Sequence, residues 1–244
     1  MRRTHRGPLM DTDILEANVG QLVGGDNPKL TKRADYSFAW GGFGSKDFFH
    51  YFFPLMTSSS VKSVMDSWDE IGKDGYFGIA MNLVMADIEG NIGYMLLLPQ
   101  PNRKNKTPFI GCRVIDGTTT EFDWDGLMPL SANPRSYNPA RGYIMTANNR
   151  QAPDHAINDN GATQMSTSRS QRIDEVLSGK IARGEKISVE DMSALQQDVH
   201  DINSRKLMPA ILTLASQMKS EFSSDDRLDL EQMLLILEDW DNEM

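Results

Sequence analysis

Residues 76–98, YFGIAMNLVMADIEGNIGYMLLL, decide the fold of this chain. Two apolar runs, 76–87 and 92–98, are separated by Glu89-Gly90-Asn91, and Gly and Asn tolerate the positive φ angles of a tight reversal. The segment therefore predicts an antiparallel β-hairpin. Both runs are apolar enough to be buried on two faces, so we expect the hairpin near the centre of a sheet.

On the N-terminal side of this hairpin the sequence predicts one helix. Ser58-Ser59-Ser60 precedes apolar residues at helical spacing, and Gly72 is a suitable end for the helix. Its apolar positions are Val61, Val64, Met65, Trp68 and Ile71. The rest of residues 1–165 has short apolar runs between turn signals, which is typical of strands and loops. A further central strand is expected over residues 142–147, GYIMTA, ending at the polar pair Asn148-Asn149.

Residues 166–244 change to a helical pattern with few glycines. Ser188 and Asp191 have the spacing of a capping box, and apolar residues follow on one face: Met192, Leu195, Val199 and Ile202. The other expected helices cover 169–177 (ended by Gly179), 207–218, and 228–240 (capped by Ser224 or Asp225). The predicted fold class is α+β, with an antiparallel sheet followed by a C-terminal helical segment.

The composition is that of an acidic globular protein. Of 244 residues, 39% are hydrophobic and 24% charged, and the net charge of −9 disfavours partners such as nucleic acid or an anionic membrane surface. No apolar run has the length of a membrane span. The start, MRRTHRGP, is basic but no apolar region follows it, so the sequence predicts no secretory signal. The single cysteine, Cys112, excludes an internal disulfide and a cysteine-based zinc site, and we expect it to be an inert thiol.

A search for known catalytic patterns finds no complete active site. The four histidines lie far apart, and the chain has no HExxH pair, GxSxG elbow, P-loop or strand-linked GxGxxG. Gly41-Gly42-Phe43-Gly44 is read as a loop. The aromatic run 48–53, FFHYFF, suits either an interface or internal helix packing, and we favour packing.

The clearest candidate for chemistry is Asn148, at the end of the strand expected over residues 142–147. A carboxamide N–H held there can donate to a developing oxyanion, and such a donor is worth about 3 kcal/mol of transition-state stabilisation. The alternative is that Asn148 caps the strand-to-loop turn through an Asx hydrogen bond. From the residues alone the turn is favoured, and both roles stay open.

Several short motifs follow one another along almost the whole chain. They are Thr4-His5-Arg6-Gly7-Pro8-Leu9, residues 87–94 (DIEGNIGY), Pro101-Asn102-Arg103, residues 123–129 (DWDGLMP), residues 138–149 (NPARGYIMTANN), residues 168–173 (SRSQRI), and residues 195–198 (LQQD). Each motif alone is weak, but together and in this order they resemble the interior of the β-subunit of the penicillin acylase (penicillin amidase) family. These enzymes are N-terminal nucleophile hydrolases.

The resemblance implies a fold and a chemistry. The fold is an αββα sandwich, of which residues 1–244 would form part. The chemistry is hydrolysis of a linear amide in a small N-acyl compound, either an acylated β-lactam nucleus or an acyl-homoserine lactone. A serine at a free N-terminus attacks the carbonyl, and its α-amine serves as the base. By match, Asn148 is the oxyanion donor, Arg169 orients the site, and Asp159 corresponds to a ligand of a structural calcium, the one metal implied.

The resemblance also implies parts that lie outside these motifs. The nucleophilic serine and the backbone half of the oxyanion hole are expected upstream of Thr4, and a complementary α chain of the same precursor is the expected partner. No cofactor is required, and export or a periplasmic location is implied. The rival interpretation is a catalytically incomplete remnant that acts as a structural or interaction subunit.

Overall fold

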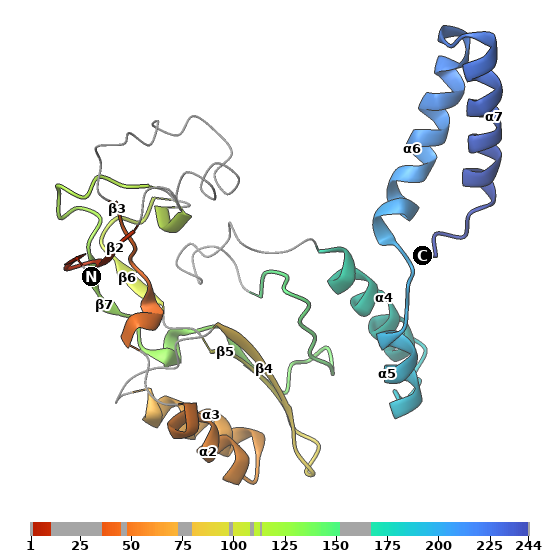
Figure 1. The fold of residues 1–244 in the computed structure, drawn as a ribbon. Coiled ribbons are helices and arrows are strands. Elements are labelled where there is room, and N and C mark those ends of the chain that lie inside the picture. Colours follow the sequence, from red (N-terminus) through yellow and green to blue (C-terminus); the bar gives the residue numbers. More distant parts are fainter. Residues whose placement is uncertain are drawn as a thin grey trace. The chain divides into compact units, whose positions relative to one another are not determined.

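The computed structural model describes residues 2–10, 36–44, 48–72, 80–97, 100–107, 110–112, 114–151 and 167–243 (Figure 1). The chain forms two compact units. Unit 1 comprises residues 1–144 and 150–164, and unit 2 comprises residues 145–149 and 165–244. The short stretch 145–149 therefore belongs with the C-terminal helices, although it lies inside the N-terminal part of the sequence.

The predicted hairpin is confirmed and forms the main sheet of unit 1. Strands β4 (Met81–Ala86) and β5 (Ile92–Leu97) are antiparallel, and Gly90 turns the chain between them with a φ of 85°. Strand β8 (Arg135–Tyr137) pairs with the other edge of β5, which gives the order β4-β5-β8. The expected burial on two faces holds for β5 alone. Strand β4 is partly exposed because it is an edge strand of this sheet.

Two helices pack on this sheet, so the prediction of one helix is wrong. Helix α3 (Val61–Ile71) begins at a capping box of Ser60 and Ser63 and ends at Gly72, as predicted from its spacing. Helix α2 (Phe48–Thr57) is the element that was missed. Its aromatic run has neither the alternation of a strand nor polar residues that mark one helical face.

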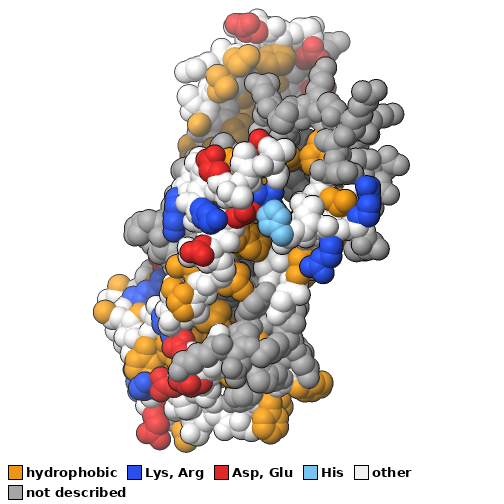
Figure 2. All heavy atoms as spheres, turned by 90° about the vertical axis from the view of Figure 1, so that its left-hand side faces the viewer, with side chains coloured by type: hydrophobic (Ala, Val, Ile, Leu, Met, Phe, Trp, Pro, Cys, Tyr) orange, Lys and Arg blue, Asp and Glu red, His pale blue; other side chains and the backbone are white. Residues whose placement is uncertain are grey.

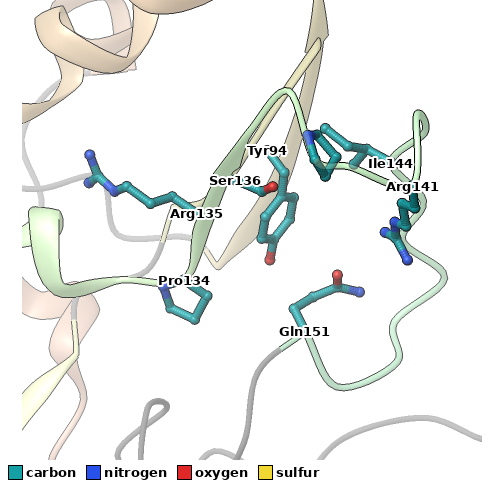
Figure 3. Close-up of a pocket in the computed structure, with 8 residues that line it drawn as sticks. Tyr94, Pro134, Arg135, Ser136, Arg141, Ile144 and Gln151 are labelled. Atoms are coloured by element: carbon teal, nitrogen blue, oxygen red, sulfur yellow. The ribbon is translucent and has the colours of Figure 1, made fainter.

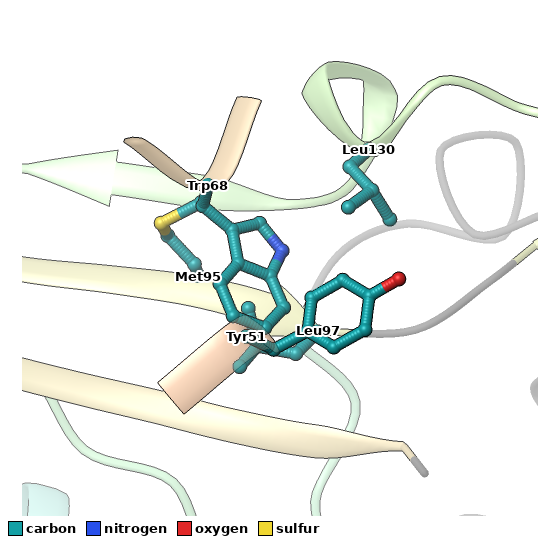
Figure 4. Packing of buried hydrophobic residues seen from close by; sticks show 5 residues of the cluster. All are labelled: Tyr51, Trp68, Met95, Leu97 and Leu130. Atoms are coloured by element: carbon teal, nitrogen blue, oxygen red, sulfur yellow. The ribbon is translucent and has the colours of Figure 1, made fainter. Parts of the chain in front are cut away.

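The core of unit 1 lies between these helices and β5 (Figure 4). Tyr51 of α2 and Trp68 of α3 have ring centroids 5.6 Å apart, and both side chains are buried. Met95, Leu97 and Leu130 complete the cluster. The aromatic run of α2 thus contributes Tyr51 to packing, whereas Phe49 and Phe53 are exposed.

The remaining strands of unit 1 form two small sheets. Strands β1 (Arg3–Thr4), β2 (Gly7–Met10) and β3 (Tyr36–Ser37) pair in that order, and β6 (Pro101–Arg103) pairs with β7 (Trp124–Leu127). In the described part of unit 1, the 3-10 turns η1 (Gly41–Gly44), η2 (Ile110–Cys112) and η3 (Leu130–Ala132) lie between these elements.

The central strand expected over residues 142–147 is absent, since residues 143–147 pair with no strand of the described chain. In this segment, contacts of the Arg141 side chain take the place of hydrogen bonds between strands. The Arg141 Nε donates to the Tyr143 carbonyl at 2.9 Å, and its guanidinium lies 4.7 Å from the centre of the Tyr143 ring.

Unit 2 is helical, as the sequence predicts. It contains α4 (Ser168–Ala182), α5 (Val189–Gln196), α6 (Ile202–Met218), η6 (Lys219–Glu221) and α7 (Ser224–Asp239). The capping box of Ser188 and Asp191 at the start of α5 is confirmed.

Several predicted helix limits in unit 2 are wrong. Gly179 does not end α4, and the continuous apolar face through Ile202 is broken because α5 ends and Ile202 begins α6. Helix α7 is capped by Ser223 instead of Ser224 or Asp225. Together the helices and antiparallel strands give an α+β fold. Among the described residues, no helix combines the length and apolar character needed to cross a bilayer.

Candidate functional site: a positioned carboxamide

The candidate site lies within unit 2, where residues 145–149 meet α4. Asn148 has a φ of 61°, in the left-handed region that Asn adopts more readily than most residues. The side-chain oxygen of Asn149 accepts a hydrogen bond from the Ala147 N–H at 3.0 Å. Asn149 thus bonds back to the residue before Asn148, and among the described residues the Asn148 side chain makes no Asx hydrogen bond of the kind considered as its alternative role.

Arg169, in the first turn of α4, fixes the orientation of the Asn148 amide. The Arg169 Nη2 donates to the Asn148 Oδ1 at 2.8 Å and to the Ala147 carbonyl at 3.0 Å. Because a guanidinium can only donate, the amide oxygen must face Arg169 and the amide nitrogen must face away from it. The predicted pair Asn148 and Arg169 is thus in direct contact.

The Asn148 side chain is exposed, and its Nδ2 has no acceptor among the described residues. The Asn148 side chain is therefore an N–H donor in a fixed orientation at the surface. The residue before it, Ala147, is buried, with 5% of its surface exposed. Such a donor can bind a carbonyl oxygen or the oxyanion that forms from it.

The hairpin motif of residues 87–94 carries polar side chains with a different role. The Asp87 carboxylate accepts from the backbone N–H groups of Val61 (3.1 Å), Glu89 (3.1 Å) and Asn91 (2.9 Å). Burial alone would raise the pKa of Asp87, but these donors and the Asn91 amide outweigh it and lower the pKa below its usual value. Asp87 therefore holds the turn and the start of α3 together.

Two asparagines extend this network to the next strand. The Asn91 Nδ2 donates to both carboxylate oxygens of Asp87, each at 3.1 Å. Asn138 donates from Nδ2 to the Asn91 Oδ1 at 2.8 Å, and its Oδ1 accepts from the Ile92 N–H at 2.9 Å. Asp87, Asn91 and Asn138, hereafter the hairpin network, thus join β4, β5 and the end of β8.

A pocket of about 380 Å³ opens beside β5 and β8, lined in part by Tyr94, Arg135, Ser136 and Gln151 (Figure 3). The Tyr94 hydroxyl donates to the Asn82 Oδ1 at 2.7 Å, and burial raises the pKa of Tyr94 above its usual value. Arg135 binds Asp69 through two hydrogen bonds of 2.8 Å each. The Tyr94 hydroxyl and the Arg135 guanidinium are therefore occupied by structural contacts, and neither is a candidate reactive group.

The other predicted site residues contribute less. Asp159, the candidate calcium ligand, and His155 lie outside the described residues. Within the described part of the chain, no group of three or more His, Cys, Asp or Glu side chains is placed to hold a metal. His5 contacts Asp123 at 3.1 Å, and the Cys112 backbone lies in η2.

The penicillin amidase family model matches residues 1–244. The chain belongs to this family. Across 98% of its length it is 27% identical to penicillin acylase 2 proenzyme of Pseudomonas sp. (strain SE83), covering 28% of that protein. It is 35% identical to penicillin G acylase of Escherichia coli over 33% of the chain, and 34% identical to acyl-homoserine lactone acylase QuiP of Pseudomonas fluorescens (strain Pf0-1) over 42%.

A solved structure supports the fold. The thermostable penicillin G acylase from Alcaligenes faecalis matches 99% of this chain with a TM-score of 0.60 and 22% identity, and the match covers 38% of that chain. The α+β fold of an N-terminal nucleophile hydrolase is therefore confirmed. The chain spans 9–28% of the length of the curated relatives named above.

Two residues that shape the sites lie within the quoted motifs, but the sequence analysis gave them no role of their own. Asn149 makes the turn that displays Asn148, and Asp87 caps both the hairpin and α3. Asp87 could have been found, because an Asp at the start of a turn commonly accepts from the backbone N–H two residues on, as Asp87 does from Glu89. The Val61 contact comes from 26 residues away and has no local signal.

Proposed function

We propose that this chain contributes the oxyanion-binding part of an amidohydrolase that cleaves linear amides in small N-acyl compounds. Asn148 is the side-chain donor, and Arg169 is the positioning residue that holds it. The observation that carries the proposal is the hydrogen bond from Arg169 to the Asn148 oxygen, which directs the amide N–H outward.

The chemistry follows from that geometry. When a nucleophile adds to an amide carbonyl, the oxygen gains negative charge, and a fixed N–H donor stabilises this charge more than it stabilises the ground state. The positive charge of Arg169 polarises the Asn148 amide through its oxygen, which makes the N–H a better donor. In this proposal the nucleophile is an N-terminal serine supplied by a segment outside these 244 residues.

The names of the relatives favour two substrate classes. One is an acylated β-lactam, as for the penicillin acylases, and the other is an acyl-homoserine lactone, as for QuiP. Both contain a linear amide with a variable acyl group, so the same donor serves either substrate.

The test measures hydrolysis of a penicillin and of an acyl-homoserine lactone by the protein in its native polypeptide context. Release of the free amine, lost in the Asn148→Ala variant and kept in the Asn138→Ala variant, supports the proposal. Asn138 is a matched control because its amide is already bonded to Asn91. No hydrolysis of either substrate, or equal activity in Asn148→Ala, would contradict the proposal and favour a non-catalytic subunit.

A further inference from the structure

A second pocket, of about 440 Å³, is built entirely from unit 1. Hairpin β1–β2, the turn η1 and strand β7 form its walls. Its lining combines basic and aromatic side chains, which is unusual in a chain whose net charge is −9. Figure 2 shows this face, where Lys and Arg side chains lie around a histidine beside hydrophobic surface.

The aromatic wall comes from Trp40 and Phe43, whose ring centroids are 5.3 Å apart in an edge-to-face arrangement. Trp40 is 48% exposed and Phe43 is 53% exposed, so both rings present apolar surface to the pocket. The backbone of η1 fixes this wall. A Cβ at Gly42 would lie 2.3 Å from the Trp40 ring, so only glycine allows the indole to rest there.

Asp123 is the one carboxylate among the described residues that line the pocket, and its hydrogen bonds hold it in the ionised form. Asp123 accepts from His5 at 3.1 Å and from the Arg6 Nε at 2.7 Å. These two partners, His5 first, lower the pKa of Asp123 against the opposing effect of burial. Arg6 also donates to the carbonyls of Gly117 and Thr119, which leaves it little capacity for a ligand.

Two further cations of the pocket remain available. Arg3 of β1 and Lys104, which follows β6, are exposed and line the same space. Among the described residues, neither side chain has a hydrogen bond or ion pair. Uncompensated cations beside apolar aromatic surface are the features that recognise an amphipathic anion.

We propose that this pocket binds a small carboxylate that carries an aromatic body. The aromatic part stacks on Trp40 and Phe43, and the carboxylate faces Arg3 and Lys104. A monoanion is favoured over a phosphate dianion because the ionised Asp123 lies in the same pocket and repels added negative charge. The pocket volume lies within the range of small-molecule sites.

The experiment titrates the full chain with 2-naphthoate by isothermal calorimetry. Neutral 2-naphthamide, acetate, and 2-naphthyl phosphate are the matched probes for charge, aromatic body and second negative charge. We expect saturable 2-naphthoate binding that weakens as salt is raised, and at least about tenfold weaker binding of 2-naphthamide and of acetate. Equal binding of naphthoate and naphthamide, tighter binding of 2-naphthyl phosphate, or no binding of naphthoate overturns the proposal.

Variants locate the site. Arg3→Ala and Lys104→Ala each weaken 2-naphthoate binding about threefold, and the double variant weakens it about tenfold. Both residues are exposed, so folding is not expected to suffer. Lys62→Ala is the control, because Lys62 is an exposed cation on α3 that pairs with Asp66 away from this pocket. A loss in Lys62→Ala equal to that in the Arg3 and Lys104 variants means nonspecific attraction and refutes the site.

Discussion

The hairpin network and the Asn148 turn use the same residue type in opposite ways. In the hairpin network, Asn91 and Asn138 use both ends of their amides, and every bond joins one strand or turn to another. At the turn, Asn148 uses only its oxygen, which is bound by Arg169. An asparagine whose donor is already bonded stabilises the fold, whereas one whose donor faces outward is available to a ligand.

The largest expected effect concerns Asn148, whose amide N–H faces outward. Asn148→Ala in the active protein lowers kcat about 100- to 1,000-fold and changes KM little, because the donor acts mainly in the transition state. Steady-state kinetics on an N-acyl substrate measure the split. A rise in KM with kcat unchanged would mean that Asn148 binds substrate and does not stabilise the oxyanion.

The next effect tests the packing that the hairpin network supports. A Cβ at Gly93 of β5 would lie 2.3 Å from the Val61 Cγ1 at the start of α3. Gly93→Ala therefore lowers the free energy of unfolding by about 1–3 kcal/mol, measured by urea denaturation.

Gly179 provides the matched control for that substitution. Its added Cβ would meet nothing closer than 3.4 Å, and it lies inside α4. Gly179→Ala is expected to raise the free energy of unfolding by about 0.5–1 kcal/mol through helix propensity. If both variants change stability alike, α3 does not pack closely on Gly93.

A smaller effect separates the donor from the residue that positions it. Arg169→Lys keeps the charge but loses the planar guanidinium, whose Nη2 reaches both the Asn148 oxygen and the Ala147 carbonyl. We expect kcat to fall about tenfold with KM unchanged, because the amide remains present but is held less firmly. A fall in kcat as large as that of Asn148→Ala would mean that Arg169 itself contacts the reacting atoms.

The smallest effect concerns the pH dependence of the hairpin network. The folded-state pKa of Asp87 is lowered, so its contribution to stability is present above the unfolded pKa, about 3.9, and is lost as pH falls through the folded value. Asp87→Asn should therefore lower the urea midpoint at pH 7, and the difference from wild type should shrink below about pH 4. Asp125→Asn, at an exposed position of β7, is the control and should change the midpoint little at either pH. A difference for Asp87→Asn that is constant with pH would contradict the ionised network.

Much of the fold was predictable because its signals are local. The hairpin at Gly90, helix α3 and the capping box at Ser188 each depend on residues within a few positions of one another. Helix α2 was missed because its aromatic residues carry no clear period, and Tyr51 is placed by contact with Trp68. The strand expected over residues 142–147 was wrong because a strand needs a partner, which a single segment does not specify.

For the candidate site, the sequence alone singled out Asn148 and Arg169 and the family to which their motifs belong. It also determined the hairpin, since turn chemistry and apolar runs act over short distances. Only the tertiary structure decided that Asn149 makes the turn and that Arg169 binds the Asn148 oxygen, because these contacts depend on where α4 meets residues 145–149. The direction of an amide is set by its neighbours in space, and Arg169 lies twenty-one positions after Asn148 in the sequence.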